Sequence, residues 1–177
     1  MTFDEAFEKL IGHEGGFQND PKDRGNWTGG KIGKGELKGT KFGISAASYP
    51  HLDIKNITLA EAKAIYKRDF WDETLRDLIH LIQPPLDFTL FDIAVNSGVP
   101  TAHKYLQKAL GVKADGIIGP RTQSVLLDVI REGQHDKLDN RINAIRLLEM
   151  SDMKGFSRNG KGWVRRVAKN ILESNKV

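Results

Sequence analysis

Apolar residues recur at helical spacing from the start of the chain. Thr2 and Glu5 form a capping box, and the apolar residues after it recur every three or four positions, which predicts an amphipathic helix over residues 2–14. A second capping box, Thr58 with Glu61, predicts a helix that runs toward Trp71.

Prolines and glycines mark the ends of further helices in the second half of the chain. The prolines that suit a first helical turn are Pro85, Pro100 and Pro120, and the glycines that follow each helix are Gly98, Gly111 and Gly133. The helix after Pro85 is apolar over most of its surface, which predicts a central position. Two more helices are expected over roughly residues 136–152 and 162–174.

Residues 15–43 break this pattern, because they are rich in Gly, Asp, Asn and Lys and hold few apolar positions. A loop of this length in a compact domain is typical of a functional region. Short strand pieces are expected only there, so the predicted fold class is mainly α, with a small irregular or β-hairpin loop region.

Composition narrows the possible chemistry. The chain of 177 residues contains no cysteine, which excludes disulfides and thiolate metal sites. Its five histidines show no metal-ligand spacing, and it has neither a P-loop nor a dinucleotide fingerprint, so we expect no cofactor and no metal. No segment reaches the ~20 apolar residues of a membrane span, and the acidic N-terminus does not resemble a signal peptide. We therefore expect synthesis in the bacterial cytoplasm.

Positive charge gathers at the C-terminus. Residues 154–176 carry seven Lys or Arg and one acid, whereas the rest of the chain carries 20 basic and 22 acidic residues. A basic terminal helix can contact nucleic acid, an anionic membrane or an anionic wall polymer, or can simply be a solvated face.

The stretch "IGHEGGFQND", residues 11–20, raises the possibility of acid catalysis. Glu14 continues the apolar stripe of the first predicted helix, where burial raises the pKa of a carboxyl group. The glycines after it allow close approach of a substrate to the backbone. These are the requirements of a general acid, although a carboxylate beside an ordinary glycine helix cap would look the same.

Three residues in the loop are candidate partners of Glu14. Asp20 and Asp23 lie in "NDPKDRG", and Thr40 precedes the return to the core at Phe42. Glycoside hydrolysis pairs one acid with a second group that positions or activates water, which such a loop residue can supply. Asp-Pro and Asp-x-Gly also favour turns, so a structural role for both aspartates remains open.

Five motifs in order resemble glycoside hydrolase family 108, the N-acetylmuramidases of phages and bacteria that include secretion-activator-like proteins. The motifs are "EGGF", "NDPKDRG", "TKFGIS", "ITLAEAKAIYKRDFW" and "FDIAVNSG". The resemblance covers roughly residues 3–98 and continues more weakly to about residue 172. It implies a lysozyme-like fold with a cleft between its lobes.

The resemblance assigns roles to individual residues. Glu14 falls on the catalytic glutamate, and Asp23 and Thr40 fall on motif positions, where we expect one of them to position the water. Phe17 stands where the family usually has tyrosine, and Asp20 and Gly43 fall on conserved motif positions. An unusually long spacer, "NWTGGKIGKGELKG", leaves open whether Thr28 or Thr40 corresponds to the family threonine.

The last motif and the long spacer supply other candidates for binding sugar. Asn96 and Ser97 end the motif that lines the cleft in the family, although an asparagine there can also be a helix cap, and Asp92 can serve a structural hydrogen bond. Trp27, in the polar loop, is a better candidate for stacking on sugar than Trp71, which we expect in the core.

The segment "LQKALGVKADGIIGPRTQ", residues 106–123, resembles helical peptidoglycan-binding modules. We therefore divide the chain into a catalytic region, residues 1–98, and a predicted peptidoglycan-binding region, residues 99–177, packed as one lysozyme-like unit. In lysozyme-like folds the second segment can also serve only as a wall of the cleft.

The leading hypothesis is an N-acetylmuramidase whose partner is the peptidoglycan glycan strand, helped by contact of the basic helix with an anionic wall or membrane. It would act as a monomer in the periplasm or wall after holin-like or dedicated export, in phage lysis or protein release. Alternatives are a lytic transglycosylase that uses Glu14 alone and a non-catalytic wall-binding or secretion accessory protein. Nucleic-acid binding rests on the basic tail alone and is not expected.

Overall fold

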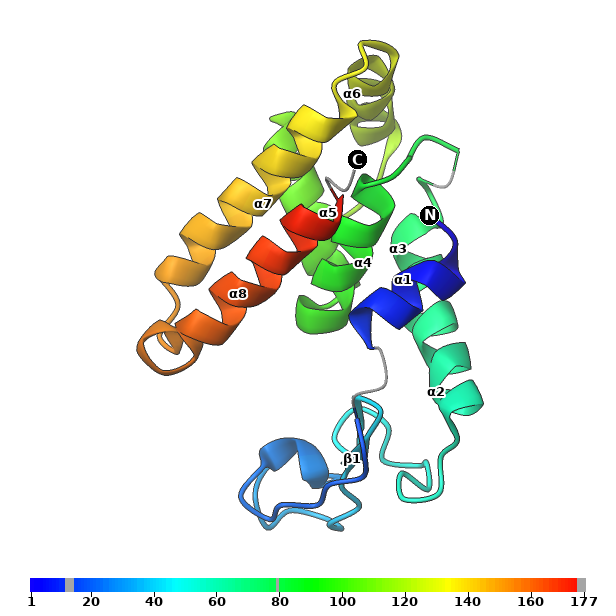
Figure 1. Ribbon diagram of the computed structural model, residues 1–177, viewed down its shortest axis with the longest axis vertical. Helices are drawn as coiled ribbons and strands as arrows, with labels where there is room; N and C mark the ends of the chain where they lie inside the picture. The colour runs from blue at the N-terminus through cyan, green and yellow to red at the C-terminus, as the bar shows by residue number, and fades with distance from the viewer. Residues whose placement is uncertain (12–14, 79, 175–177) are drawn as a thin grey trace. The chain divides into compact units, whose positions relative to one another are not determined.

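The structure is a computed structural model that describes residues 1–11, 15–78 and 80–174. These residues form helices and one small antiparallel hairpin, which confirms the predicted mainly α fold (Figure 1). The chain divides into two compact units. The N-terminal unit comprises Thr2–Arg68, and the C-terminal unit comprises Asp69–Val177 together with Met1.

Two helices carry the core of the N-terminal unit, α1 (Phe3–Leu10) and α2 (Leu59–Tyr66). Each begins with the predicted capping box, in which the Thr2 or Thr58 hydroxyl accepts from the backbone N–H three residues later. The rings of Phe7 and Tyr66 meet edge to face at 5.6 Å between centroids. The predicted continuation of the first helix to Glu14 falls on residues 12–14, outside the described part of the chain.

Between these helices the chain is mostly loop, as predicted. It contains a short 3-10 helix, η1 (Arg24–Asn26), and the hairpin of β1 (Thr40–Lys41) and β2 (Ile44–Ser45). Thr40 pairs with Ser45 and Lys41 with Ile44 in an antiparallel register. Both residues of the connecting turn have positive φ, 50° at Phe42 and 75° at Gly43, as a two-residue hairpin turn of type I′ requires.

After α2 the helix widens for six residues and then returns to α geometry. Lys67–Asp72 form a π-helical segment, η2, which leads into α3 (Glu73–Leu75). Trp71 is buried and meets the ring of Phe91 edge to face at 5.3 Å, which confirms its predicted place in the core.

The C-terminal unit is built around α4 (Leu86–Ser97), whose residues Leu86 to Ala94 are all buried. This confirms the predicted central helix. The helices α5 (Val99–Leu110), α6 (Pro120–Arg131) and α7 (His135–Ser151) follow, with the left-handed Gly111 ending α5 as expected. One apolar cluster joins α4 to α5, α6 and α7.

The last helix, α8 (Phe156–Ser174), runs beside α7 and begins six residues before the predicted start at residue 162 (Figure 1). The predicted start was wrong, because the helix continues through Gly160 and Gly162, although glycine has a low helix propensity. A Cβ at Gly160 would lie 2.6 Å from Cδ2 of Phe156, so this glycine makes room for the Phe156 ring, which also meets Trp163.

Among the described residues, no helix has both the length and the apolar character needed to cross a membrane.

Candidate active site

The loop of the N-terminal unit is organised around one buried amide, Asn26. Its side chain is fully buried, and its Nδ2 donates to Oε1 of Gln18 at 2.8 Å and to the carbonyl of Asp20 at 2.9 Å. Its Oδ1 accepts from Nε2 of Gln18 at 3.0 Å and from the Thr40 hydroxyl at 2.8 Å. All four hydrogen-bonding positions of the amide are therefore used, which fixes the segments around it relative to one another.

Asp23 and Asp20, the two predicted loop acids, border this amide. Asp23 caps η1, with Oδ1 accepting from the Gly25 N–H at 2.8 Å and Oδ2 from Nε2 of Gln18 at 3.4 Å. Asp20 accepts from the Lys22 N–H at 2.9 Å. Both aspartates thus form the turns that their sequence context favours. Both also remain exposed, and a carboxylate offers about four lone-pair positions, so each can still accept from a water molecule.

Thr40 is held against the same amide from the opposite side of the loop. Its hydroxyl donates to Asn26, and its backbone exchanges hydrogen bonds with Gln18 at 2.9 and 2.8 Å. The structure therefore brings Asp20, Asp23 and Thr40 together through Gln18 and Asn26. The sequence analysis missed these two connecting residues, because nothing in a loop sequence tells a buried amide from an exposed one.

The long spacer after η1 forms a closed side loop. Trp27 pairs with Leu37, the Thr28 N–H donates to the Glu36 carbonyl at 2.9 Å, and the N–H groups of Lys38 and Gly39 return to the Asn26 carbonyl. The extra residues therefore begin and end at Asn26 and leave Thr40 beside it. The Thr28 hydroxyl is used inside the side loop, where it accepts from the Glu36 N–H at 2.9 Å.

Gly43 and Gly15 explain why small residues are needed next to the hairpin. A Cβ on Gly43 would lie 2.2 Å from the Tyr66 hydroxyl, and a Cβ on Gly15 would lie 2.9 Å from Cα of Phe42. The Tyr66 hydroxyl donates to the Phe42 carbonyl, and the Phe42 N–H donates to the Gly15 carbonyl at 2.8 Å. The residue directly after Glu14 is thus anchored to the hairpin turn.

The two predicted aromatic binding residues differ in exposure. The Phe17 side chain is 38% exposed and lines a pocket of about 370 Å³ in the N-terminal unit. Trp27 is half-buried, and its Nε1 donates to the Pro21 carbonyl at 2.9 Å, which fixes its orientation. Their proposed contact with sugar stays a prediction.

Asn96 and Ser97 lie at the exposed C-terminal end of α4, in the C-terminal unit. Nδ2 of Asn96 donates back to Oδ1 and the carbonyl of Asp92. Asp92 is fully buried and also accepts from Nη1 of Arg146 at 2.6 Å. Asp92 therefore has the structural role that the sequence analysis left open, and it holds the Asn96 side chain in one orientation at the end of the helix.

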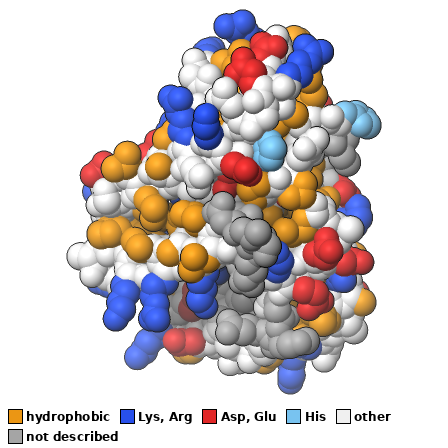
Figure 2. All heavy atoms as spheres, turned by 45° about the horizontal axis from the view of Figure 1, so that its top comes forward, with side chains coloured by type: hydrophobic (Ala, Val, Ile, Leu, Met, Phe, Trp, Pro, Cys, Tyr) orange, Lys and Arg blue, Asp and Glu red, His pale blue; other side chains and the backbone are white. Residues whose placement is uncertain are grey.

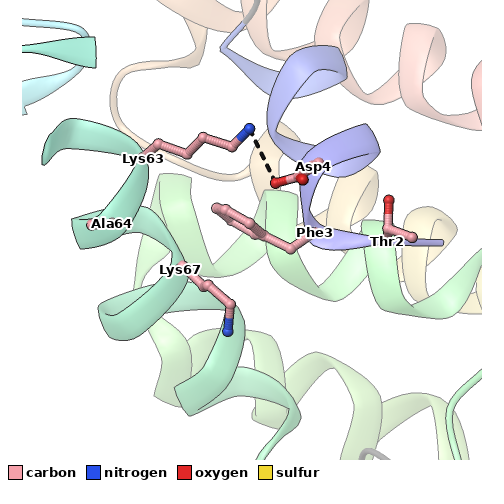
Figure 3. A pocket seen from close by; sticks show the side chains of 6 residues that line it. All are labelled: Thr2, Phe3, Asp4, Lys63, Ala64 and Lys67. Atoms are coloured by element: carbon pink, nitrogen blue, oxygen red, sulfur yellow. Dashed lines mark ion pairs between the residues drawn. The ribbon is translucent and has the colours of Figure 1, made fainter. Parts of the chain in front are cut away.

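A second pocket, of about 350 Å³, lies between α1 and α2 (Figure 3). Phe3 lies at its wall, and Nζ of Lys63 pairs with Oδ1 of Asp4 at 3.0 Å. None of the predicted site residues lines this pocket, and its one acid is already paired, so it offers no candidate general acid.

Glu14, the predicted catalytic acid, lies outside the described residues. Within the described part of the chain, no group of three or more His, Asp or Glu side chains could hold a metal ion.

Comparison with known proteins identifies the family. A model described as Glycosyl hydrolase 108 matches residues 7–98, more than half of the 177 residues. The chain belongs to glycosyl hydrolase family 108. The matched segment includes Glu14, the Asn26 loop and α4. Family membership makes this protein a glycoside hydrolase and implies peptidoglycan as its substrate.

The fold is similar to that of a solved structure, Brucella abortus SagA, with a TM-score of 0.75 and 28% sequence identity. The similarity covers 97% of this chain and 92% of that chain, so it extends through the helices that follow the family match. No curated protein matches the sequence.

Proposed function

We propose that this family 108 hydrolase is an N-acetylmuramidase, which cleaves the β-1,4 bond between N-acetylmuramic acid and N-acetylglucosamine. The observation that carries the proposal is the family match over residues 7–98, a range that includes Glu14. The proposed role of Glu14 comes from the resemblance of its motif to the family pattern. Gly15 is anchored to the Phe42 turn, and this contact supports a defined backbone position next to the acid.

In the proposed reaction Glu14 donates a proton to the glycosidic oxygen as the bond to the sugar breaks. A water molecule then completes the hydrolysis, so the second group must accept a proton from water or orient it. Asp23 is the better candidate for this role, because it is an exposed carboxylate held by Gly25 and Gln18. The Thr40 hydroxyl already donates its proton to Asn26, so it can only accept from the water.

Trp27 is proposed to contact a sugar face and Phe17 to contact another part of the substrate, with Asn96 and Ser97 available for polar groups such as an acetamido group. Aromatic rings suit this role because they offer a flat apolar surface beside a polar edge. Asn96 suits a polar contact because its Nδ2 donates to Asp92, which fixes the orientation of the amide. Its Oδ1 is then held in one direction and can accept a hydrogen bond from the substrate.

The basic face of α8 is proposed to hold the enzyme against an anionic wall surface. Its five basic side chains are all exposed and fall on the helix face opposite the buried Val167; they are Arg158, Lys161, Arg165, Arg166 and Lys169. No ion pair of theirs is found among the described residues. The face drawn in Figure 2 carries Lys and Arg side chains beside hydrophobic ones.

This function requires the chain to reach peptidoglycan, which lies outside the inner membrane. We propose a holin-like pore or a dedicated secretion route, serving lysis by a phage or release of proteins through the wall. The assignment of residues 99–177 to peptidoglycan binding also stays a proposal.

Mass spectrometry of the fragments released from purified peptidoglycan tests the reaction. The wild type should release fragments with reducing N-acetylmuramic acid ends, and Glu14→Gln should lose at least the ~10²–10⁴-fold that a positioned acid contributes. Glu8→Gln is the matched control, because it makes the same chemical change at an exposed acid of α1 and should keep full activity.

The same spectra separate the alternatives. Anhydro ends would identify a lytic transglycosylase, which needs no water-positioning group. Binding to wall sacculi without released fragments would identify a non-catalytic accessory protein, and full activity of Glu14→Gln would exclude Glu14 as the acid.

A further inference from the structure

The pocket beside Phe17 has a wall made of apolar side chains. Phe17 and Leu37 are 38% and 37% exposed, and Ile54 is almost fully buried beneath them. The Phe17 ring lies directly on Gly39, where a Cβ would come within 2.7 Å of Cε2 of the ring. This packing restrains the ring, so the wall exists before any ligand binds.

The rim of the pocket carries charges of both signs. Lys38 and Lys55 contribute two ammonium groups, Asp53 a carboxylate and Asn19 an amide. Nδ2 of Asn56 donates to Asp53 at 2.8 Å, and this hydrogen bond holds the pKa of Asp53 below its usual range, so the group is ionised at neutral pH. Nζ of Lys38 donates to the Pro50 carbonyl at 2.9 Å, which fixes its position on the rim.

Such a pocket suits a short peptide better than a sugar. The glycan of peptidoglycan offers hydroxyl and acetamido groups, whereas its stem peptide offers carboxylates, an amino group and methyl side chains. Two ammonium groups and one carboxylate around an apolar wall are complementary to that second set. The volume of about 370 Å³ is in the range of small-ligand pockets.

One wall residue of the pocket lies close in sequence to the proposed catalytic acid. Phe17 follows Glu14 by three residues, and muramic acid carries both the bond proposed to break and the stem peptide. We propose that the pocket formed by Phe17, Leu37, Ile54 and the rim residues Lys38, Asp53 and Lys55 binds the stem peptide, so that the enzyme prefers peptide-bearing glycan. The preference rests on the muramidase function proposed above.

Lys55→Glu tests the pocket, with Lys31→Glu as the matched control. Both lysines are exposed residues of the N-terminal unit, and Lys31 lies outside the pocket lining. The two substrates are intact peptidoglycan and the same glycan freed of peptides by an amidase, and kcat/KM is measured on each from the reducing ends released.

The wild type and Lys31→Glu should prefer the intact substrate. Lys55→Glu should lose roughly fivefold in kcat/KM on that substrate, mainly through KM, with no change on bare glycan. Equal wild-type rates on both substrates would overturn the proposal. So would an equal loss on both substrates, which would mean that Lys55 contacts the glycan itself, and so would an equal loss in Lys31→Glu.

A binding measurement keeps this proposal separate from the proposed reaction. A soluble tetrapeptide of stem composition is titrated into the full chain by calorimetry, with the wild type, Lys55→Glu and Lys31→Glu. Saturable binding that only Lys55→Glu weakens supports the pocket even if no glycan is cleaved, whereas no binding to the wild type overturns it. If neither glycan substrate is cleaved while the peptide binds, the proposed hydrolysis has failed and the pocket has not.

Discussion

The two units of this hydrolase are stabilised in different ways. The C-terminal unit packs α5, α6 and α7 onto the buried α4 around one apolar cluster. The N-terminal unit holds a long loop in place with the buried amide of Asn26 and with glycines in close contacts. Apolar packing spreads its stabilisation over many contacts, whereas the loop depends on a few directional bonds. Most predicted site residues lie in the second kind of structure, where small changes should matter most to function.

The buried ion pair of the C-terminal unit should give the largest effect on stability. Asp92 and Arg146 are both buried, with 2.6 Å between Oδ2 of Asp92 and Nη1 of Arg146. Asp92→Ala leaves an uncompensated buried guanidinium and should lower the free energy of unfolding by about 3–5 kcal/mol. The free energy of unfolding from urea titration measures this loss.

A surface pair provides the control for that prediction. Lys108 pairs with Glu149 at partly exposed positions, so Glu149→Ala should cost at most about 1 kcal/mol. Similar losses in the two variants would contradict the stabilising role of the buried pair in this unit.

Asn26→Ala should destabilise the loop of the N-terminal unit and leave the C-terminal unit unchanged. It removes the hydrogen bonds that tie Gln18, Asp20 and Thr40 together, and each of these contributes about 0.5–1.5 kcal/mol. Hydrogen exchange should accelerate at the Gln18 and Thr40 amides while α4 amides keep their protection, and wall hydrolysis should fall. Asn140→Ala, at an exposed residue of the same type in α7, is the control. Equal acceleration in α4 would mean that the two units unfold together.

Gly43→Ala should cost about 1–3 kcal/mol, because an L residue at φ 75° is strained and its Cβ would meet the Tyr66 hydroxyl. Tyr66→Phe removes that hydroxyl and should recover part of the loss in a double-mutant cycle of unfolding free energies. Additive losses would show that strain alone accounts for the glycine.

The sequence predicted the helices of this fold well because capping boxes, prolines and glycines are local signals. Thr2, Thr58 and Gly111 each act within about one turn of the residues that they cap. Gly160 shows the limit of such signals, because the orientation of the Phe156 ring, one turn earlier in α8, makes a glycine acceptable there, and residue type alone does not predict that orientation.

The sequence predicted only the part of the candidate site that local motifs mark. Asp23 and Thr40 were found by their motifs, but Asn26 and Gln18 join them through contacts eight and fourteen positions apart along the chain. Asn26 also closes the long side loop, so the inserted residues leave Thr40 in place. Such contacts depend on which amide is buried, and no periodicity in a loop encodes burial.

The smallest predicted effect is a difference between the two units in how their stability depends on pH. In the N-terminal unit, hydrogen bonds from Thr2 and Thr58 lower the pKa values of Glu5 and Glu61, the capping-box acids of α1 and α2. Their contribution to stability is present above the unfolded pKa of these acids and is lost as the pH falls through the lowered folded values. In the C-terminal unit, burial raises the pKa of Asp139. Its contribution has the opposite sign: it is present at acid pH and is lost as the pH rises through the raised folded value.

Asp139→Asn tests this difference, because it keeps the shape of the side chain and an acceptor for Nδ2 of Asn143 while removing the titration. The variant should gain stability relative to the wild type as the pH rises from acid to neutral, in unfolding free energies measured across that range. Glu61→Gln should show the reverse trend, with its relative loss largest near neutral pH and smallest in acid. If both variants followed the wild-type pH profile in parallel, neither carboxyl would titrate differently in the folded and unfolded chain. The difference between a buried acid in the C-terminal unit and exposed capping acids in the N-terminal unit would then not change the free energy of unfolding.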